Sequence, residues 1–518
     1  MQENIKQIPK EKFEFAQINT NMHDEKLKTK ARGYFADALV RFKKNKSSVI
    51  AAFIIGLLVL FAIVSPIISP YSVYDKDNDY QKYPPYVESI ANLGIGILDG
   101  GTTLKSQNAL QVQKLTAIGV ETGRDVILAE PDEVEIVENY RGQERVRIAY
   151  NVTVNKYFQK GITYKVMSYE EYEAIQEWQK QTGKRILYPV LENKDIYVLG
   201  EKDKLPASRN SNIWYKCDVK GNAILDENGS FIPAYSTNKS ISYGNYDSIR
   251  IEGDDGSYIY NIAKSGSVEC RIDYYTYYQY KNGGLTPTYV FGTDEYGRDL
   301  FCAIGMGARF SLLFAIVVSA INLTIGTIYG AIQGYYGGFV DMSMDRFSEI
   351  LGGIPFIIVA TLFQLHLAQK VGVVPSFLFA FVLTGWLGMA ALTRKQFYRF
   401  KSQEYVMAAR TLGASDRRIM FKHILPNSLG TMVTSCALVI PGVISSETSL
   451  SYLGIVNLTQ FVGTSIGELM ASGQNGMSTA PHAMLYPALF FSLLMISFNL
   501  FGNGLRDAFN PSTRGVDD

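Results

Sequence analysis

The sequence predicts a membrane protein that is all α-helical within the bilayer, with six transmembrane helices and an inserted α+β extracytoplasmic domain after the first. Three observations predict this fold class. Apolar runs of about twenty residues, the length that crosses roughly 30 Å of hydrocarbon, occur near the N-terminus and again through the C-terminal part. A long polar stretch without such a run separates them, and basic residues precede the first run. The mean hydropathy of +0.01 therefore averages two opposite populations of residues.

Residues 1–48 are predicted to form a cytoplasmic tail that contains an amphipathic helix. The positive-inside rule keeps this tail in the cytoplasm, because basic residues precede the first apolar run. These are Lys26, Lys28, Lys30, Arg32, Arg41, Lys43, Lys44 and Lys46. Phe35, Leu39 and Phe42 recur at helical spacing against this cationic face. The pattern indicates a helix lying on the anionic inner leaflet or, equally, a juxtamembrane helix that continues into the first span.

Residues 49–70 are predicted to be the first transmembrane helix. A secretory signal would also follow basic residues, but its apolar core is about 7 to 15 residues long and ends at a small-residue cleavage site. This run is longer and ends in Ser-Pro-Ile-Ile-Ser-Pro. We therefore expect a retained anchor that leaves the membrane on the extracytoplasmic side.

Residues 71–290 are predicted to form the inserted extracytoplasmic domain, because they are polar and rich in tyrosine and β-branched residues. Two β-rich runs, 133–137 and 145–154, flank a turn at Arg141-Gly142 and predict a hairpin.

A helix is predicted from Ser168, because Ser168 and Glu171 have the spacing of a capping box and Gly183 is placed to end the helix. The glycine-rich run 93–101 lacks the dinucleotide-binding spacing, so it predicts a turn.

Two of the four cysteines, Cys217 and Cys270, lie in this polar stretch, whereas Cys302 and Cys436 lie beside or within apolar runs. An extracytoplasmic location would permit a disulfide between Cys217 and Cys270, and two free thiols are the equal alternative.

Five further apolar runs complete the set of spans. They are residues 310–330, 350–368, 377–392, 430–449 and 483–502, within a five-helix membrane core at 291–504. An even number of spans returns the C-terminal tail, residues 505–518, to the cytoplasm. Arg394, Lys395, Arg399 and Lys401 follow the fourth span and fall on the same side, as the positive-inside rule requires.

The loop between the fourth and fifth spans, residues 400–427, carries a distinctive pattern. Small residues on one side let a helix sit deep in a groove of a partner, and Gly413 permits a sharp turn. Pro426 is expected to stop a second helix before the membrane. The residues that make up the pattern are Glu404, Tyr405, Ala408, Ala409, Gly413, Ala414, Leu425 and Pro426.

This spacing resembles the EAA loop of ABC importer permeases, which docks on an ATPase subunit. The resemblance implies the type I ABC importer permease fold, a homologous second permease subunit and two cytoplasmic ABC ATPase subunits. It implies no catalytic residue, metal or cofactor in this chain, since ATP and Mg are used by the ATPase partners. Alternating access would follow from rigid-body movement of the helices.

Further motifs resemble those of oligopeptide and dipeptide permeases of the "C" type. They lie at residues 41–46, 291–299, 307–313, 334–341, 447–454 and 498–507. The resemblance implies a subunit of the bacterial cell membrane that forms the translocation pathway for peptides, which an extracytoplasmic peptide-binding protein delivers. Two features depart from the family. The long insertion replaces a short loop, and Gly463-Thr-Ser-Ile-Gly467 stands in place of Pro-Ser-Trp-Gly.

The fifth span contains the candidates for the translocation pathway or gate. Pro441 and Gly442 interrupt the helix, so their neighbours' backbone groups can line a cavity. Glu447 is an intramembrane carboxylate, which is a functional candidate by default. Its alternative role is structural, as a capping or paired group at the membrane interface.

Other function classes find little support in the residues. The chain has no Gly-x4-Gly-Lys-Ser/Thr phosphate loop and no His-Glu-x-x-His motif, so we expect neither ATP hydrolysis nor a catalytic metal. His366 and His482 are isolated near span ends and are expected to be structural. The net charge of +1, without a basic domain, argues against nucleic acid.

Two alternatives to peptide import stay open. One is a permease for nickel or another small solute, and the other is a membrane-anchored sensor or adhesion protein, which would not need a docking loop.

Overall fold

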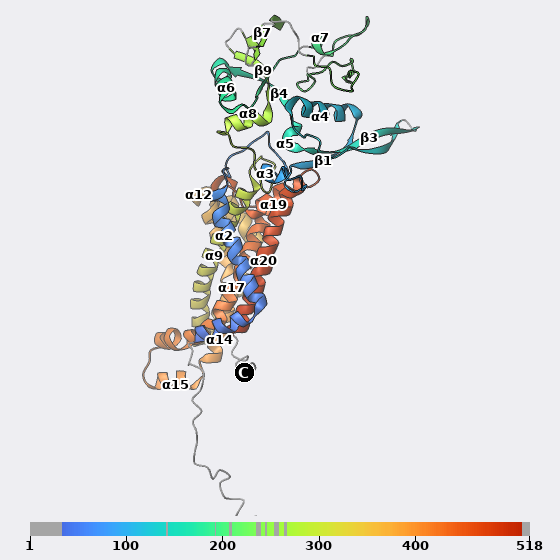
Figure 1. The fold of residues 1–518 in the computed structure, drawn as a ribbon. Helices are drawn as coiled ribbons and strands as arrows, with labels where there is room; N and C mark the ends of the chain where they lie inside the picture. The colour runs from blue at the N-terminus through green and yellow to red at the C-terminus, as the bar shows by residue number, and fades with distance from the viewer. Residues whose placement is uncertain are drawn as a thin grey trace, which may run out of the picture.

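The computed structural model describes residues 34–140, 143–191, 193–206, 210–234, 240–243, 246–252, 258–263 and 267–509. Long helices form a bundle at one end of the molecule, and the strands lie together at the other end (Figure 1). We refer to residues 71–290, between the first two long helices, as the inserted part.

Five helices of the described chain are long and apolar enough to cross a membrane, and a bent pair adds a sixth crossing if it counts as one span. The five are α2 (Lys46–Ile68), α9 (Leu300–Tyr336), α13 with α14 (Val373–Gly385 and Leu387–Phe400), the helix Asp416–Tyr452 that includes α17 (Leu425–Tyr452), and α20 (His482–Phe509). The bent pair joins α10 (Gly338–Gly352) to the segment from α11 (Phe356–Leu362) to α12 (Ala368–Val371). The chain therefore has the helical content of a multi-pass membrane protein.

The third span differs from the sequence prediction, which made residues 350–368 one continuous helix. The structure divides this stretch between α10 and α11, which meet at a bend of 71°. Pro355 precedes α11 and explains the break, because it lacks an N–H and disfavours the helical conformation at Ile354. The apolar composition alone did not reveal this bend.

The expectation that Pro426 ends a helix before the membrane is wrong. The helix that begins with α16 (Asp416–Arg418) continues through a π-helical turn at Ile419–Ile424 directly into α17. Pro426 stands in the first turn of α17, where its missing N–H is tolerated, and the wider π-helical turn before it accommodates the change in hydrogen-bonding pattern.

Helices α9 and α14 pack with their backbones in close contact. Gly326, Gly330 and Gly334 recur every four residues along α9 and face α14. A Cβ atom on Gly330 would lie 2.2 Å from the carbonyl oxygen of Ala390, so this position has no room for a side chain. Small residues at this spacing permit such close approach between membrane helices.

The tail helix α1 (Tyr34–Lys44) is separate from α2. Asn45 between them has a non-helical conformation, and its side chain accepts a hydrogen bond from the N–H of Ser48 at the start of α2. Phe42 is buried against Phe501 of α20, with ring centroids 5.5 Å apart, while Leu39 is exposed. The structure therefore contradicts the alternative of one helix running unbroken into the first span.

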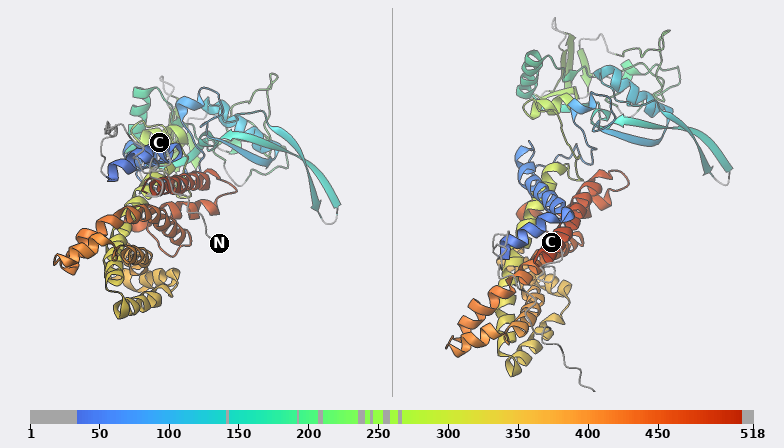
Figure 2. Two further views of the ribbon diagram at one scale, coloured as in Figure 1. Left: turned by 90° about the horizontal axis from the view of Figure 1, so that it is seen from below. Right: turned by 60° about the horizontal axis from the view of Figure 1, so that its bottom comes forward.

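The inserted part contains two antiparallel sheets. One has the order β1-β3-β2, with β1 at Gly101–Gln107, β2 at Asp132–Tyr140 and β3 at Gln143–Asn155. The other has the order β4-β9-β8-β7-β6, and β5 (Leu187–Tyr188) also pairs with β9. Its strands are β4 at Ile162–Ser168, β6 at Ser240–Tyr243, β7 at Tyr246–Glu252, β8 at Tyr258–Ala263 and β9 at Ser267–Asp273. The hairpin predicted from the sequence is β2–β3, and Figure 2 shows it projecting sideways from the rest of the molecule in both views.

Helices flank these sheets. They are α3 (Glu88–Ala91), α4 (Ala109–Thr122), α5 (Lys156–Gln159), α6 (Tyr169–Thr182), α7 (Asn193–Ile196) and α8 (Tyr274–Lys281). The helix predicted from Ser168 is α6. The Ser168 hydroxyl accepts a hydrogen bond from the N–H of Glu171, and Gly183 ends the helix at a φ of +69°. The glycine-rich run 93–101 forms turns before β1, as expected.

The cysteines Cys217 and Cys270 are both free, so the disulfide that the sequence left open is not formed. Their thiols lie in separate hydrophobic clusters, Cys217 beside Trp214 and Cys270 beside Ile175. Burial raises the pKa of Cys217 to about 12 and that of Cys270 further still, so both stay protonated near neutral pH.

The two ends of the inserted part are paired with each other. Tyr86 and Tyr289 exchange two backbone hydrogen bonds of 2.8 Å, and Lys82 N donates to Asp294 O at 2.9 Å. Buried tyrosines gather around this pair: Tyr80, Tyr83, Tyr86, Tyr157, Tyr275, Tyr278 and Tyr289. The cluster connects the inserted part to the segment that leads into α9.

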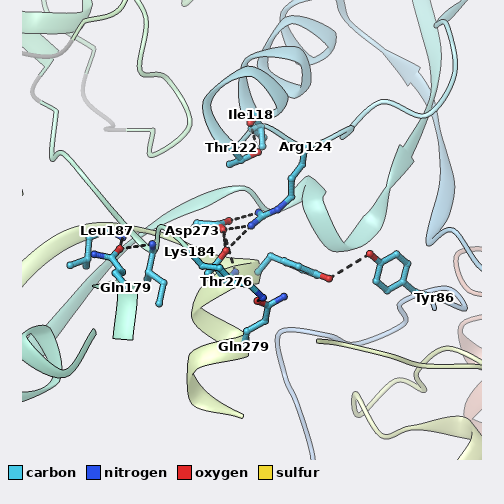
Figure 3. Close-up of polar contacts among 12 residues, drawn as sticks. Tyr86, Ile118, Thr122, Arg124, Gln179, Lys184, Leu187, Asp273, Thr276 and Gln279 are labelled. Atoms are coloured by element: carbon cyan, nitrogen blue, oxygen red, sulfur yellow. Dashed lines mark hydrogen bonds and ion pairs between the residues drawn. The ribbon is translucent and has the colours of Figure 1, made fainter. Parts of the chain in front are cut away.

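An ion pair joins two helices of the inserted part beside this cluster. Arg124, just after α4, donates to Asp273 and to Thr276 at the start of α8, with distances of 2.6 to 2.9 Å (Figure 3). Asp273 is buried, and it also accepts from the N–H of Thr276. The bidentate contact therefore fixes α4 against α8.

Candidate functional site

The loop singled out by the sequence lies at the end of the bundle opposite the sheets (Figure 1). It contains α15 (Glu404–Thr411), a turn at Gly413 and the start of α16. Gly413 has a φ of +81°, a left-handed conformation that glycine adopts without strain. The N–H groups of Gly413 and Ala414 donate to Arg410 O and Ala409 O, which closes the end of α15. The sharp turn expected at Gly413 is therefore present.

The two faces of α15 have different environments. Val406 is fully buried against Ile419 and Phe397, so this face is attached to the bundle. On the other face Glu404, Tyr405 and Ala408 are exposed, and Leu412 at its end is 87% exposed. The face of α15 that points away from the bundle therefore presents Tyr405 and Leu412 to the surroundings.

Hydrogen bonds attach the loop to the end of α9. The Tyr335 hydroxyl donates to Asp416 at 2.6 Å and accepts from the Arg410 guanidinium at 3.2 Å. One side chain of α9 thus holds both α15 and α16. Leu425 is partly buried and Pro426 is exposed, so neither belongs to the exposed face of α15.

Two adjoining cavities lie between α9, α13–α14 and α17. Their volumes are about 360 and 410 Å³, and they share Asn322, Gly385 and Val439 as lining residues. The first cavity is also lined by Ser319, Leu323, Gly388, Met389, Ala391, Leu392, Lys395, Ser435 and Cys436. The second is also lined by Phe356, Phe381, Thr384, Gly442, Val443 and Ser446. Large apolar side chains therefore share the lining of these cavities with small and hydroxyl-bearing ones.

The three pathway candidates of the sequence occupy different surroundings. The interruption expected at Pro441 and Gly442 is wrong, because α17 continues through both residues. Gly442 lines the second cavity, whereas Pro441 is buried within α17. Glu447 is fully buried, and it accepts hydrogen bonds from Ser311 at 2.7 Å and from Ser451 at 3.1 Å. Its carboxylate thus connects α17 to α9 and lines neither cavity.

Several residues of this region were not identified from the sequence. Leu412 was missed because its exposure follows from the packing of Val406 against the bundle. Asn322 is an isolated amide within an apolar run, and sequence gives no sign that it borders a cavity. His482 lies with Nε2 3.1 Å from Thr293 O, which agrees with the structural role expected for it.

Two family models match the chain. Residues 309–515 match the binding-protein-dependent transport system inner membrane component. Residues 33–85 match the N-terminal TM domain of oligopeptide transport permease C. Most of the inserted part lies between the two matches.

Curated relatives match about half of the chain. The oligopeptide transport system permease protein OppC of Haemophilus influenzae is 42% identical over 224 residues, which make up 43% of this chain and 70% of that protein. The dipeptide transport system permease protein DppC of Lactococcus lactis is 37% identical over 281 residues, 54% of this chain and 78% of that protein. A solved chain of the MetNI methionine ABC transporter aligns with a TM-score of 0.34 at 15% identity, over 40% of this chain and 96% of that chain.

Proposed function

The chain belongs to the oligopeptide and dipeptide permeases of ABC importers, and on this premise we propose that its bundle forms one half of a translocation pathway for peptides. A homologous second permease supplies the other half. The cavities between α9, α13–α14 and α17 support this assignment, because they place polar groups inside an otherwise apolar bundle.

The exposed face of α15 is the proposed docking surface for one of two cytoplasmic ATPase subunits. These partners bind ATP and Mg, and this chain is a non-catalytic transport subunit. The support is the arrangement of the loop: Leu412 is exposed, while Val406 and the contacts of Tyr335 fix the helix to the bundle. Movement of an ATPase against α15 would therefore pass directly to α9 and α17.

The end of the bundle that carries α15 is proposed to face the cytoplasm, together with both termini. Basic residues favour this orientation, since Arg399 and Lys401 lie at the end of α14 and Arg41 lies just before α2. The inserted part then lies outside, as an α+β extracytoplasmic domain that contacts the peptide-binding protein. Its projecting β2–β3 hairpin exposes Val146 and Ile148, which suit such a contact.

The Glu447 contacts suggest a role at the outer gate. The carboxylate connects α17 to α9 through Ser311, so the two helices move as one unit while these hydrogen bonds are made. Gly442, one turn or more away on α17, borders the open cavity instead. We assign Gly442 to the pathway and Glu447 to the positioning of the helices that line it.

The coupling loop is the observation that carries the proposal, and it supplies the test. Cells that lack this chain should lose uptake of radiolabelled short peptides, and the wild-type chain should restore it. Leu412→Asp should not restore it, because charge at the docking surface removes about 2 kcal/mol of apolar contact. Met477→Asp, at another exposed apolar side chain after α19 (Ile466–Asn475), is the control and should restore uptake.

Two results would contradict the proposal. Loss of nickel uptake without loss of peptide uptake would assign the chain to the metal branch of the family. Restoration of peptide uptake by Leu412→Asp would mean that the exposed face of α15 is not the docking surface.

A further inference from the structure

Asn322 has an unsatisfied hydrogen-bonding group in the middle of the bundle. It lies on α9, it is only 3% exposed, and its Oδ1 has no hydrogen-bond partner. The hydroxyl of Ser319, one turn earlier on the same helix, is likewise buried without a partner. Both residues line the first cavity, and Asn322 lines the second as well.

An unpaired amide oxygen is costly at such a position. Polar groups inside membrane bundles are paired, or they face a cavity that admits water or a transported ligand. The vacancy is on an acceptor, so a ligand fills it with a hydrogen-bond donor such as an N–H.

The neighbouring glycines leave space for a ligand in the two cavities that Asn322 borders. Gly385 packs directly on the Asn322 side chain, because a Cβ there would lie 2.3 Å from Nδ2. Gly388 and Gly442 border the two cavities, and a Cβ on either would meet nothing within 4 Å. The glycines thus hold the amide in place on one side and leave room on the other.

The charge of the lining favours a peptide over a metal ion. Lys395 is the charged residue among the lining side chains, and the lining contains no carboxylate or imidazole. A divalent cation would be repelled by Lys395, and Cys436 is the single thiol among the lining side chains, too few ligands to hold a metal ion. A peptide main chain offers an N–H at each residue and makes no demand on the identity of the side chains.

We infer that Asn322, assisted by Ser319, accepts a hydrogen bond from a main-chain N–H of the peptide as it passes through the bundle. This inference rests on the proposed function and adds the group that recognises the substrate class within the membrane. Recognition of the main chain lets one pathway pass peptides of many sequences.

The test compares two peptides in cells that express the whole importer. One is radiolabelled tri-alanine, and the other is tri-alanine with both internal amides N-methylated, which removes the donors. With the wild-type chain, tri-alanine should be taken up faster. Asn322→Ala should slow tri-alanine uptake about three- to tenfold, the effect of one hydrogen bond, and should reduce the difference between the two peptides by the same factor.

Filling the cavity provides a second measurement. Gly388→Leu and Gly442→Leu should each lower tri-alanine uptake without affecting assembly. Gly56→Leu is the matched control, because a Cβ on Gly56 of α2 also meets nothing within 4 Å and lies outside both cavities. It should transport tri-alanine as the wild type does.

The outcomes separate the inference from the proposed function. Absence of tri-alanine uptake by wild type would overturn the proposed function itself. Wild-type uptake together with unchanged discrimination in Asn322→Ala would overturn the inference alone. Loss of the purified complex in Asn322→Ala would also overturn it, since Asn322 would then hold the second permease instead of the peptide.

Discussion

At the scale of single residues, a side chain added at Gly413 should change the conformation of the loop. Its φ of +81° costs a residue with a Cβ about 1–2 kcal/mol, although space for the atom is available. We expect Gly413→Val to displace α15 relative to α16 and to lower peptide uptake at least severalfold while the chain stays folded.

Gly183 offers the matched control for this substitution. Its φ is +69° and a Cβ there would also meet nothing within 4 Å, but it ends α6 in the inserted part. Gly183→Val should lower the thermal stability by about as much as Gly413→Val does, and it should leave uptake unchanged. Equal uptake by both variants would show that the turn at Gly413 has no special part in coupling.

Glu171 makes a pH-dependent contact in the inserted part. Partial burial raises the pKa of its carboxyl group, but the hydrogen bond from Tyr277 and the charge of Lys281 lower it by more, so the net pKa is below the ordinary 4.5. Because the pKa of Glu171 is lower in the folded protein than its ordinary value, the contact stabilises the fold at every pH above that ordinary value. The stabilisation is lost as the pH falls through the lowered pKa.

The lowered pKa of Glu171 predicts how hydrogen exchange in the inserted part depends on pH. Protection of α6 and α8 against hydrogen exchange, corrected for intrinsic rates, should be constant from neutral pH to about 5 and should decrease at lower pH. Because Glu171 is partly exposed, the effect is about 1 kcal/mol or less. Glu171→Gln should show lower protection at neutral pH and a smaller change with acid. Glu170→Gln, at an exposed neighbour, should resemble wild type, and equal profiles for both variants would contradict the assignment.

At the scale of elements, local signals decided which predictions succeeded. The pairing of β2 with β3 and the helix α6 are confirmed, because the strand pattern and the capping residue are encoded within a few positions. The turn expected at Arg141-Gly142 lies outside the described residues. The third span failed because hydropathy averages over Pro355. The start of α9 was placed ten residues late, since Arg309 separates its first turns, which are capped by Asp299, from the apolar run at 310–330.

The candidate site likewise combines features that local sequence encodes with features that depend on packing. The spacing of the loop residues was enough to find α15 and the turn at Gly413. The exposure of Leu412 depends on which face of α15 packs on the bundle, and Asn322 matters only because three helices leave a cavity beside it. Such facts arise from packing between distant segments and could not be read from the sequence.

The contact between α9 and α14 gives the prediction for this scale. Gly330→Ala would bring a Cβ to 2.2 Å from Ala390 O, so the helices must separate. We expect the free energy of unfolding of the purified chain to fall by about 1–3 kcal/mol, the usual cost of overpacking. Gly56→Ala, at an open position of α2, should lose nothing, and equal melting of the two variants would contradict the close contact.

At the scale of the whole molecule, the inserted part is attached through adjacent strands. The paired backbone of Tyr86 and Tyr289 brings its two ends together, so the long insertion does not separate α2 from α9. This arrangement explains how a bundle can carry the inserted part without changing its own helices. It also fixes where the inserted part can be removed. An excision from Tyr80 would lose Tyr83, whose N–H is held by Thr293 in the segment that leads into α9.

The excision that respects this pairing replaces residues 87–288 with Asn-Gly. A two-residue turn of this type closes on a pair that exchanges both backbone hydrogen bonds, so Tyr86 and Tyr289 can be linked directly. We expect the shortened chain to assemble with its partners and to support basal ATP hydrolysis, because the bundle and α15 are unchanged. Binding of the peptide-binding protein and peptide uptake should both fall, since the proposed contact surface is gone.

Val146→Asp, a single change on the exposed hairpin, should weaken the same binding step if β2–β3 makes the contact. Full docking and uptake by the shortened chain would instead mean that the bundle alone receives the binding protein.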